Sequence, residues 1–201
     1  MDIVLASGSP RRYDLLKKLG WNIRVIVPEI DEHILPKESP EALCVRLSTE
    51  KAAKVAEIVS NNKDGTLVVA ADTIVVLDGD VLGKPSGEEE SVHMLKRLQG
   101  RAHDVLTGVS VIGKGKVLSG MERTKVSFRS LDYEAVRAYA ATGEGADKAG
   151  AYAIQGKGSF LVSSIEGDYF NVVGLPLCRL SLMFEEMGLS LPQLWQVKKV
   201  P

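Results

Sequence analysis

The first sixty residues alternate between short apolar runs and segments whose apolar residues recur three or four positions apart. Residues 3–6 and 22–27 are strand-length runs rich in apolar side chains. Between them, Ser9 and Pro10 have the pattern of a helix N-cap and a first helical residue, and Gly20 follows the last apolar position. The pattern predicts a strand, a helix that begins at Pro10, and a second strand.

The rest of the chain continues this mixture of helices and strands. Ser39 and Pro40 repeat the pattern of a cap followed by proline and predict a helix to about Ser60, which residues 61–65 end. The pattern further predicts hairpins with turns at residues 78–80 and 113–115, helices at about 88–99, 132–141 and 177–187, and two strands within 150–175 around a glycine-rich turn at 155–159. This order of elements indicates a mixed α/β fold in a single domain, residues 1–201.

Two arginines stand in the first turn of the opening helix. Arg11 and Arg12 meet the positive end of the helix dipole there, which disfavours a cation by about 0.3–1 kcal/mol. A bound phosphate would reverse this effect, because free backbone N–H groups at a helix N-terminus bind anions and the hydroxyls of Ser7 and Ser9 add donors. The alternative is a pair of solvated arginines on a surface helix.

A carboxylate interrupts the most apolar run of the chain. Asp72 lies in the middle of LVVAADTIVV, where an unpaired charge would be costly to bury. If the following hairpin has a three-residue loop, residues 78–80, Lys84 falls on the same face as Asp72, whereas a two-residue loop places it on the other face. In the first register Lys84 is a candidate partner for Asp72, and such an ion pair is either part of a catalytic site or purely structural.

Lys51 interrupts the apolar stripe of the second predicted helix. Its ammonium group either reaches the rim of the protein or points into a cleft. Glu32 lies in the acidic loop before this helix. By itself it cannot be told from an ordinary solvated charge, and it is a candidate site residue only in combination with the other charged residues. These residues together indicate chemistry on phosphoanhydrides. They would combine an anion site containing arginines, lysines directed into a cleft, and carboxylates able to hold a divalent cation.

Composition narrows the classes of function. The 201 residues are 45% hydrophobic, and 25 basic side chains nearly balance 26 acidic ones. Such a chain can bury its own core, and its net charge of −1 supplies no general attraction for nucleic acid or an anionic membrane. No segment has the pattern of a signal peptide or a membrane span, so we expect a cytoplasmic protein without nucleic-acid or membrane partners.

The cysteines and histidines have no metal-ligand spacing. Cys44 and Cys178 fall in predicted helices, where we expect small buried side chains rather than a disulfide. His33, His93 and His103 match neither HExxH nor the arrangement of a nucleophile and its base, and we expect them at the surface or hydrogen-bonded in the core.

Seven segments carry a resemblance to a known family. They are, in chain order, LASGSPRR, EIDE, EKAAK, AADTIV, LGKP, DKAGAYAIQGKG and GDYFNVVGLPL. In order and spacing they resemble those of the Maf family of nucleoside triphosphate pyrophosphatases, over about residues 3–177. The resemblance implies a mixed, elongated α/β sheet with flanking helices, of the Ham1 or inosine triphosphatase type, with two lobes around a cleft. It also implies a homodimer and dependence on a divalent cation, Mg²⁺ or Mn²⁺.

The resemblance assigns roles residue by residue. Asp72 matches the proposed general base and, together with Glu32, the metal-handling positions. The positions that handle phosphate are matched by Ser7, Arg12, Lys51 and Lys84. The positions that separate subgroups by base preference are matched by Arg11, Thr73 and Gln155, which resemble the dTTP/UTP-preferring subgroup.

The reaction implied by the resemblance is hydrolysis of dTTP, UTP and modified pyrimidine nucleotides. Water would attack the α-phosphorus, and the products would be the monophosphate and pyrophosphate. The alternative is a nucleotide-binding regulator of cell division or septum formation in which hydrolysis is incidental. A pure sensor needs neither Asp72 nor Lys84 near the phosphates, which favours the enzyme.

Overall fold

The chain folds into two compact units. The structure, a computed structural model, describes residues 2–59 and 66–195, so the predicted break at 61–65 and the last residues lie outside the described part. Unit 1 comprises Met1–Asp72, Thr107–Glu122 and Gly174–Pro201, and unit 2 comprises Thr73–Leu106 and Arg123–Val173. Each unit is described by itself below.

The strands form a mixed sheet, which confirms the predicted α/β class. They are β1 (Asp2–Leu5), β2 (Asn22–Val25), β3 (Leu67–Leu77), β4 (Asp80–Leu82), β5 (Ala102–Gly113), β6 (Lys116–Phe128) and β7 (Val162–Glu166). Hydrogen bonds join them in the order β2-β1-β3-β5-β6-β7, and β4 pairs with β3. β1 is parallel to β2 and β3, whereas the pairs β3–β4 and β6–β7 are antiparallel.

The helices divide between the two units. Unit 1 contains α1 (Pro10–Lys18), α2 (Pro40–Val59), α6 (Leu177–Glu186) and α7 (Leu191–Leu194). Unit 2 contains α3 (Glu88–Leu98), α4 (Tyr133–Ala141), α5 (Tyr169–Val173) and two 3-10 turns, η1 (Ala149–Ala151) and η2 (Gly156–Phe160). In the described part of the chain no helix is long and apolar enough to cross a membrane.

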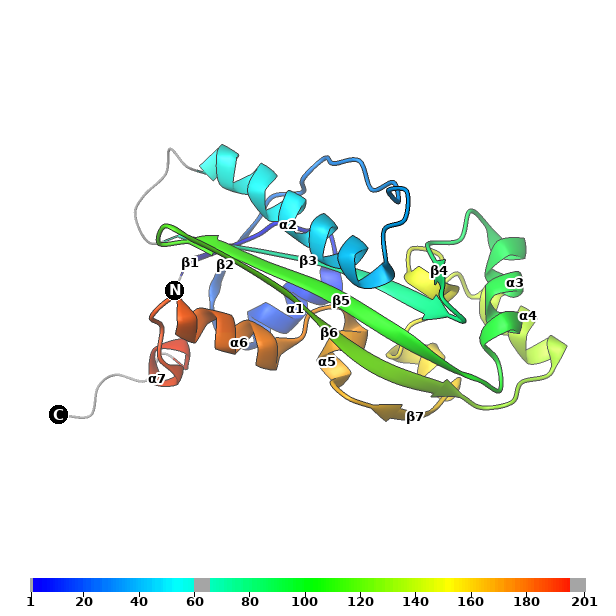
Figure 1. The fold of residues 1–201 in the computed structure, drawn as a ribbon. Helices are drawn as coiled ribbons and strands as arrows, with labels where there is room; N and C mark the ends of the chain where they lie inside the picture. The colour runs from blue at the N-terminus through cyan, green and yellow to red at the C-terminus, as the bar shows by residue number, and fades with distance from the viewer. Residues whose placement is uncertain (1, 60–65, 196–201) are drawn as a thin grey trace. The chain divides into compact units, whose positions relative to one another are not determined.

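In unit 1, α2 lies on one face of the strands and α1 and α6 lie on the other (Figure 1). The contact between α2 and β5 is very close, since a Cβ atom at Gly108 would lie 2.0 Å from the backbone oxygen of Cys44. Beside this contact the hydroxyls of Ser48 and Ser110, both buried, are 2.8 Å apart. The apolar side chains packed together here are Val4, Ala6, Ala52, Val55, Val59, Val68 and Ala70.

Gly108 is therefore a sensitive position for stability. We expect Gly108→Ala to lower the free energy of unfolding by about 2 kcal/mol or more, because α2 must move away from β5 to admit the methyl group. Urea denaturation followed by circular dichroism measures this loss. Gly87→Ala is the control, because a Cβ atom there meets nothing within 4 Å. Equal losses in the two variants would contradict the close packing of α2 on β5.

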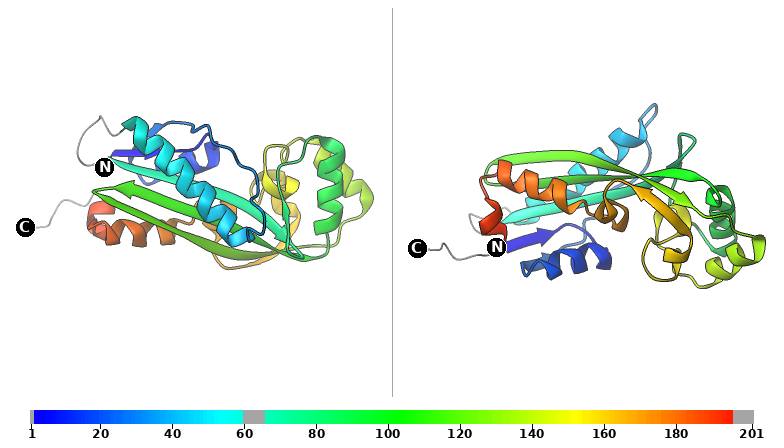
Figure 2. Two further views of the ribbon diagram at one scale, coloured as in Figure 1. Left: turned by 45° about the horizontal axis from the view of Figure 1, so that its top comes forward. Right: turned by 90° about the horizontal axis from the view of Figure 1, so that it is seen from below.

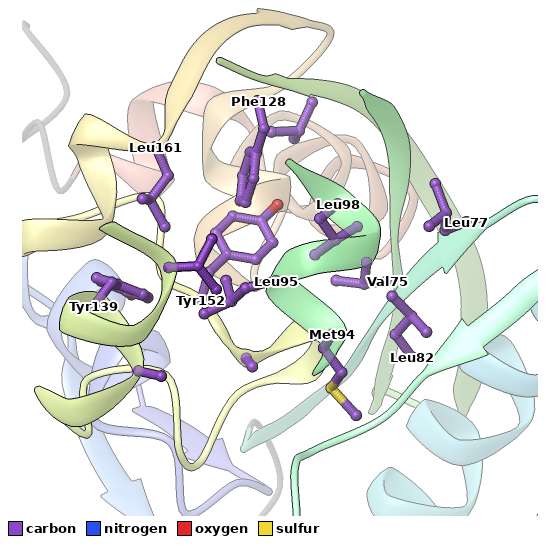
Figure 3. Close-up of a cluster of buried hydrophobic side chains, with 14 of the residues drawn as sticks. Val75, Leu77, Leu82, Met94, Leu95, Leu98, Phe128, Tyr139, Tyr152 and Leu161 are labelled. Carbon is purple, nitrogen blue, oxygen red and sulfur yellow. The ribbon is translucent and has the colours of Figure 1, made fainter. Parts of the chain in front are cut away.

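In unit 2, α3 and α4 pack side by side (Figures 1 and 2), and their buried side chains belong to the core of this unit. Figure 3 shows side chains from both helices and from the neighbouring strands directed toward one another. At its centre the rings of Phe128 and Tyr152 meet edge to face, with their centroids 4.7 Å apart. Unit 2 thus has an apolar cluster of its own, built on residues of β3, β4, β5 and β6.

His103 on β5 lies in this core, and only one of its two ring nitrogens has a hydrogen-bond partner among the described residues. Its Nε2 atom is 2.8 Å from the hydroxyl of Tyr152, whereas its Nδ1 atom has no hydrogen-bond partner within the described residues. Burial lowers the pKa of His103 from 6.5 to about 4. Between these two values the unfolded chain binds a proton that the folded protein does not bind, so acid favours unfolding.

Stability is therefore expected to fall as the pH drops below the unfolded pKa of His103. Between pH 7.5 and pH 5 the loss from this residue is about 2 kcal/mol, since one pKa unit corresponds to about 1.4 kcal/mol. Urea unfolding of the wild type and of His103→Gln at both pH values isolates this contribution. The variant should lose less stability on acidification, and parallel losses in both proteins would contradict a neutral buried imidazole.

The first hairpin of unit 2 corrects the predicted loop length. Leu77 pairs with Asp80, so the loop consists of two residues, Asp78 and Gly79. Their φ angles are 55° and 88°, the left-handed conformation of a type I′ turn, which matches the twist of paired strands. The predicted register, which placed Lys84 on the same face as the buried aspartate, is therefore wrong.

Residues 150–175 hold one strand, β7, instead of the two predicted. Gly150 and Gly156 have φ angles of 69° and 67°, and the segment around them forms η1 and η2. Tyr152 between them is buried in the core of unit 2 instead of pairing in the sheet. The strand predicted after the turn is present as β7, and the chain then forms α5 before residue 175.

The other predicted elements are confirmed with small shifts at their ends, and α7 was not predicted. Cys44 is buried as expected, but Cys178 is exposed. The buried stripe of α6 runs through Leu180, Met183 and Phe184, and Cys178 lies outside it. Both thiols are free, as expected.

Candidate active site

The N-terminus of α1 forms as its sequence predicts. Pro10 is the first helical residue, and the Ser9 side chain caps the helix by accepting a hydrogen bond from the backbone N–H of Arg12 at 3.5 Å. The hydroxyl of buried Ser7 accepts hydrogen bonds from the backbone N–H of Ser9 at 3.2 Å and from Arg12 Nη1 at 3.1 Å. The helix dipole, the Ser7 hydroxyl and the Arg12 guanidinium together allow this end of α1 to bind an anion.

Arg12 is held in place by the protein. Its Nε donates a hydrogen bond to the carbonyl oxygen of Gly174 at 2.7 Å. Burial lowers the pKa of Arg12, while the nearby carboxylates of Asp72 and Glu32 favour the charged guanidinium. Arg12 is therefore not a freely solvated surface cation, because its guanidinium group is oriented beside the helix N-terminus.

The ammonium group of Lys51 joins two carboxylates. Its Nζ atom lies 2.6 Å from Asp72 Oδ1 and 2.6 Å from Glu32 Oε1. The side chains of Lys51 and Asp72 are each only 11% exposed, whereas Glu32 is about half exposed. The structure gives Asp72 the cationic partner that its burial requires, but this partner is Lys51 and not Lys84.

A second group of charges holds the loop that carries Glu32. Arg46 on α2 donates hydrogen bonds through Nε to Glu38 Oε1 at 2.6 Å and through Nη2 to the backbone oxygen of His33 at 2.8 Å. The hydrogen bond from Arg46 lowers the pKa of Glu38 to about 2. Arg46 thus fastens the loop to α2, the helix that also carries Lys51.

The carboxylates fit a divalent cation that arrives with a substrate. Glu32 and Asp72 supply oxygen ligands, which Mg²⁺ and Mn²⁺ prefer, and both already contact one positive group, the Lys51 ammonium. Within residues 2–59 and 66–195, no group of three or more acidic, histidine or cysteine side chains could hold a metal ion. Mg²⁺ commonly combines one or two carboxylates with substrate phosphates, and the residues present suit that arrangement.

The structure gathers part of the predicted site in unit 1. The predicted residues brought together there are Ser7, Arg12, Glu32, Lys51 and Asp72. Arg11 is half-buried in the first turn of α1, and Thr73 is half-buried on β3 directly after Asp72. Lys84 and Gln155 belong to unit 2, where both are exposed and neither side chain has a polar partner among the described residues.

Sequence patterns did not identify Gly174 or Arg46 as parts of this site. Gly174 lies in the GDYFNVVGLPL segment, but nothing in that segment says that its carbonyl oxygen accepts a hydrogen bond from Arg12. Arg46 and Glu50 have the i, i+4 spacing of a helical ion pair, which is a readable signal. The more important bond to Glu38 depends on the path of the loop, for which the sequence has no signal.

Comparisons with known proteins identify a family and relatives that match nearly the whole chain. Residues 2–187 match the family described as Maf-like protein. A dTTP/UTP pyrophosphatase of Symbiobacterium thermophilum is 48% identical over 186 residues, which cover 92% of this chain and 94% of that protein. A dTTP/UTP pyrophosphatase of Dictyoglomus thermophilum is 45% identical over 193 residues, which cover 94% of this chain and 98% of that protein.

Among solved structures, the Ham1 protein of Staphylococcus aureus is similar to 64% of this chain, over 72% of its own length, with a TM-score of 0.41 and 15% identity. The family match covers more than nine-tenths of the chain, and the two relatives align with nearly all of it. The chain belongs to the Maf family.

Proposed function

We propose that the protein hydrolyses nucleoside triphosphates, above all dTTP and UTP, to the monophosphate and pyrophosphate. The observation that carries this proposal is the buried pair of Lys51 and Asp72, with Glu32 on the same ammonium group, in the unit that also holds the anion-binding end of α1. Carboxylates and fixed cations beside an anion site are the groups that catalyse cleavage of phosphoanhydrides. The names of the relatives support the same reaction.

The triphosphate is bound by groups that are already oriented. The Ser7 hydroxyl and the Arg12 guanidinium, at the start of α1, donate to phosphate oxygens. Lys51 and Lys84 neutralise the charge that develops on the departing pyrophosphate. The dipole of α1 then favours the bound anion, which explains why arginines are tolerated in its first turn.

Asp72 positions the attacking water and takes its proton. The water oxygen bonds to the α-phosphorus, and the bond between this phosphorus and the bridging oxygen breaks, so that oxygen leaves with pyrophosphate. We propose that Glu32 and Asp72 hold a divalent cation, Mg²⁺ or Mn²⁺. When bound with the nucleotide, it supplies charge stabilisation to the phosphate oxygens.

Base selection falls to Arg11, Thr73 and Gln155. A thymine or uracil edge presents two acceptors around one donor, and the Gln155 amide offers both a donor and an acceptor. We propose that both units act as one catalytic domain over residues 1–201, because a single family match runs through both of them. We further propose that the protein is a homodimer and that it acts in the cytoplasm, where nucleoside triphosphates are available.

Isotope labelling tests the position of attack. The protein is incubated with dTTP and Mg²⁺ in water enriched in ¹⁸O, and the products are analysed by mass spectrometry. Attack at the α-phosphorus places the label in dTMP and leaves pyrophosphate unlabelled. Label in pyrophosphate, or release of inorganic phosphate as the first product, would contradict the proposal.

A further inference from the structure

A carboxylate binds the backbone of the turn that carries Gln155. The N–H of Lys157 donates a hydrogen bond to Glu144 Oε1 at 2.9 Å, and the N–H of Gly158 donates one to Glu144 Oε2 at 2.7 Å. Neighbouring N–H groups in a turn form a small anion-binding concavity. No side chain caps η2 from its own start, so Glu144, in the loop after α4, supplies the missing acceptor.

Tyr139 fixes the backbone on the other side of Gln155. Its hydroxyl donates a hydrogen bond to Glu144 Oε2 at 3.0 Å and accepts one from the backbone N–H of Ala153 at 3.1 Å. Burial raises the pKa of Tyr139, so the hydroxyl remains a donor at neutral pH. Three backbone N–H groups that flank Gln155 are therefore fixed by one tyrosine and one carboxylate.

The turn has no room for a side chain at Gly156 or Gly158. At Gly156, where φ is 67°, a Cβ atom would lie 2.3 Å from Glu144 Oε1. At Gly158 it would lie 2.1 Å from the carbonyl oxygen of Ala153. The glycines of the QGKG segment thus allow the backbone to approach Glu144 closely enough for both hydrogen bonds.

Gln155 itself is exposed, and its side chain has no polar partner among the described residues. Its position is consequently set by the backbone on either side. We propose that Glu144 is a positioning residue for base selection, which holds the turn so that the Gln155 amide meets the nucleotide base. This inference rests on the proposed function and on the role of Gln155 within it.

Glu144→Gln tests the inference with almost no change of shape. The amide keeps one acceptor but presents an NH₂ group to the second backbone N–H, so the two-oxygen contact is lost. We expect the preference for dTTP over dCTP, measured as the ratio of their kcat/KM values, to fall by about tenfold. The loss should come from a higher KM for dTTP, with kcat close to that of the wild type.

A double-variant cycle separates positioning from a general loss of structure. If Glu144 acts through Gln155, then Glu144→Gln should reduce the preference in the wild type but not in a Gln155→Ala background. Glu134→Gln, the same change at an exposed position on α4, is the matched control and should leave both kinetic constants unchanged. Tyr139→Phe, which removes one hydroxyl, should shift the preference in the same direction. It is the variant that tests the inference if Glu144→Gln does not fold.

The outcomes distinguish this inference from the proposed function. A wild-type protein that does not prefer dTTP and UTP overturns the proposed function and this inference with it. A selective wild type whose preference is unchanged by both Glu144→Gln and Tyr139→Phe overturns the inference alone. The same holds if Glu144→Gln lowers the preference equally in the Gln155→Ala background.

Discussion

Asp72→Asn is expected to reduce the rate of dTTP hydrolysis by about a thousandfold while nucleotide binding is retained. The amide cannot take a proton from water and is a poor metal ligand, but its oxygen can still accept the hydrogen bond from Lys51. The variant should therefore keep its fold and its anion site. Steady-state product formation gives the rate, and calorimetric titration with dTTP gives the dissociation constant.

The matched control for this experiment is Asp14→Asn, because Asp14 is an exposed aspartate on α1. It should retain wild-type turnover. Near wild-type turnover in Asp72→Asn would remove Asp72 from the chemistry. Loss of binding together with turnover would instead assign Asp72 to the substrate or metal site alone.

Lys51→Met is expected to damage both stability and activity. Asp72 would stay buried without its ammonium partner, which costs about 3 kcal/mol of the free energy of unfolding when a buried pair is broken from one side. Hydrolysis should fall by about a hundredfold, because a fixed cation near the phosphates is lost. Urea denaturation and steady-state kinetics on the same preparation measure the two effects.

Lys54→Met provides the comparison, since Lys54 lies one turn along α2 on its exposed side. It should leave both quantities close to those of the wild type. A stable Lys51→Met variant would mean that Asp72 is neutralised in another way. A stable and fully active one would contradict the central role given to the Lys51 ammonium group.

Local signals in the sequence predicted the part of the site that depends on neighbouring residues. Ser9 and Pro10 specify the start of α1, and this start places Arg12 at the positive end of the helix dipole. An aspartate within a run of apolar residues signalled that Asp72 is buried and needs a cationic partner. Lys51 was marked by its place in an apolar helical stripe, and the structure directs it inward to Asp72.

Contacts between distant segments could not be predicted in the same way. The hairpin after β3 has aspartates on both sides of its glycine, and a shift of one residue in loop length decided which face Lys84 would occupy. The fold had to be known before Lys51 could be chosen over Lys84 as the partner of Asp72. The contacts of Arg12 with Gly174 and of Glu144 with the Gln155 turn likewise join segments whose approach no local pattern encodes.

The first of the two strands predicted within residues 150–175 is absent for a related reason. Its aromatic and β-branched residues favour strands, but three glycines at positions 150, 156 and 158 allow tight turns and close backbone contacts instead. Burial of Tyr152 against Phe128 and His103 then fixes the segment on the core of unit 2. Tertiary packing outweighed the strand propensity of its side chains.

The most direct test of the central claim is chromatography of the products formed from a panel of nucleoside triphosphates and deoxynucleoside triphosphates, with Mg²⁺ or Mn²⁺ present. We expect equal amounts of monophosphate and pyrophosphate, formed fastest from dTTP and UTP. Faster cleavage of another base would contradict the roles of Arg11, Thr73 and Gln155 while leaving the reaction in place. Tight nucleotide binding without any cleavage would contradict the enzyme itself and favour a nucleotide-binding regulator.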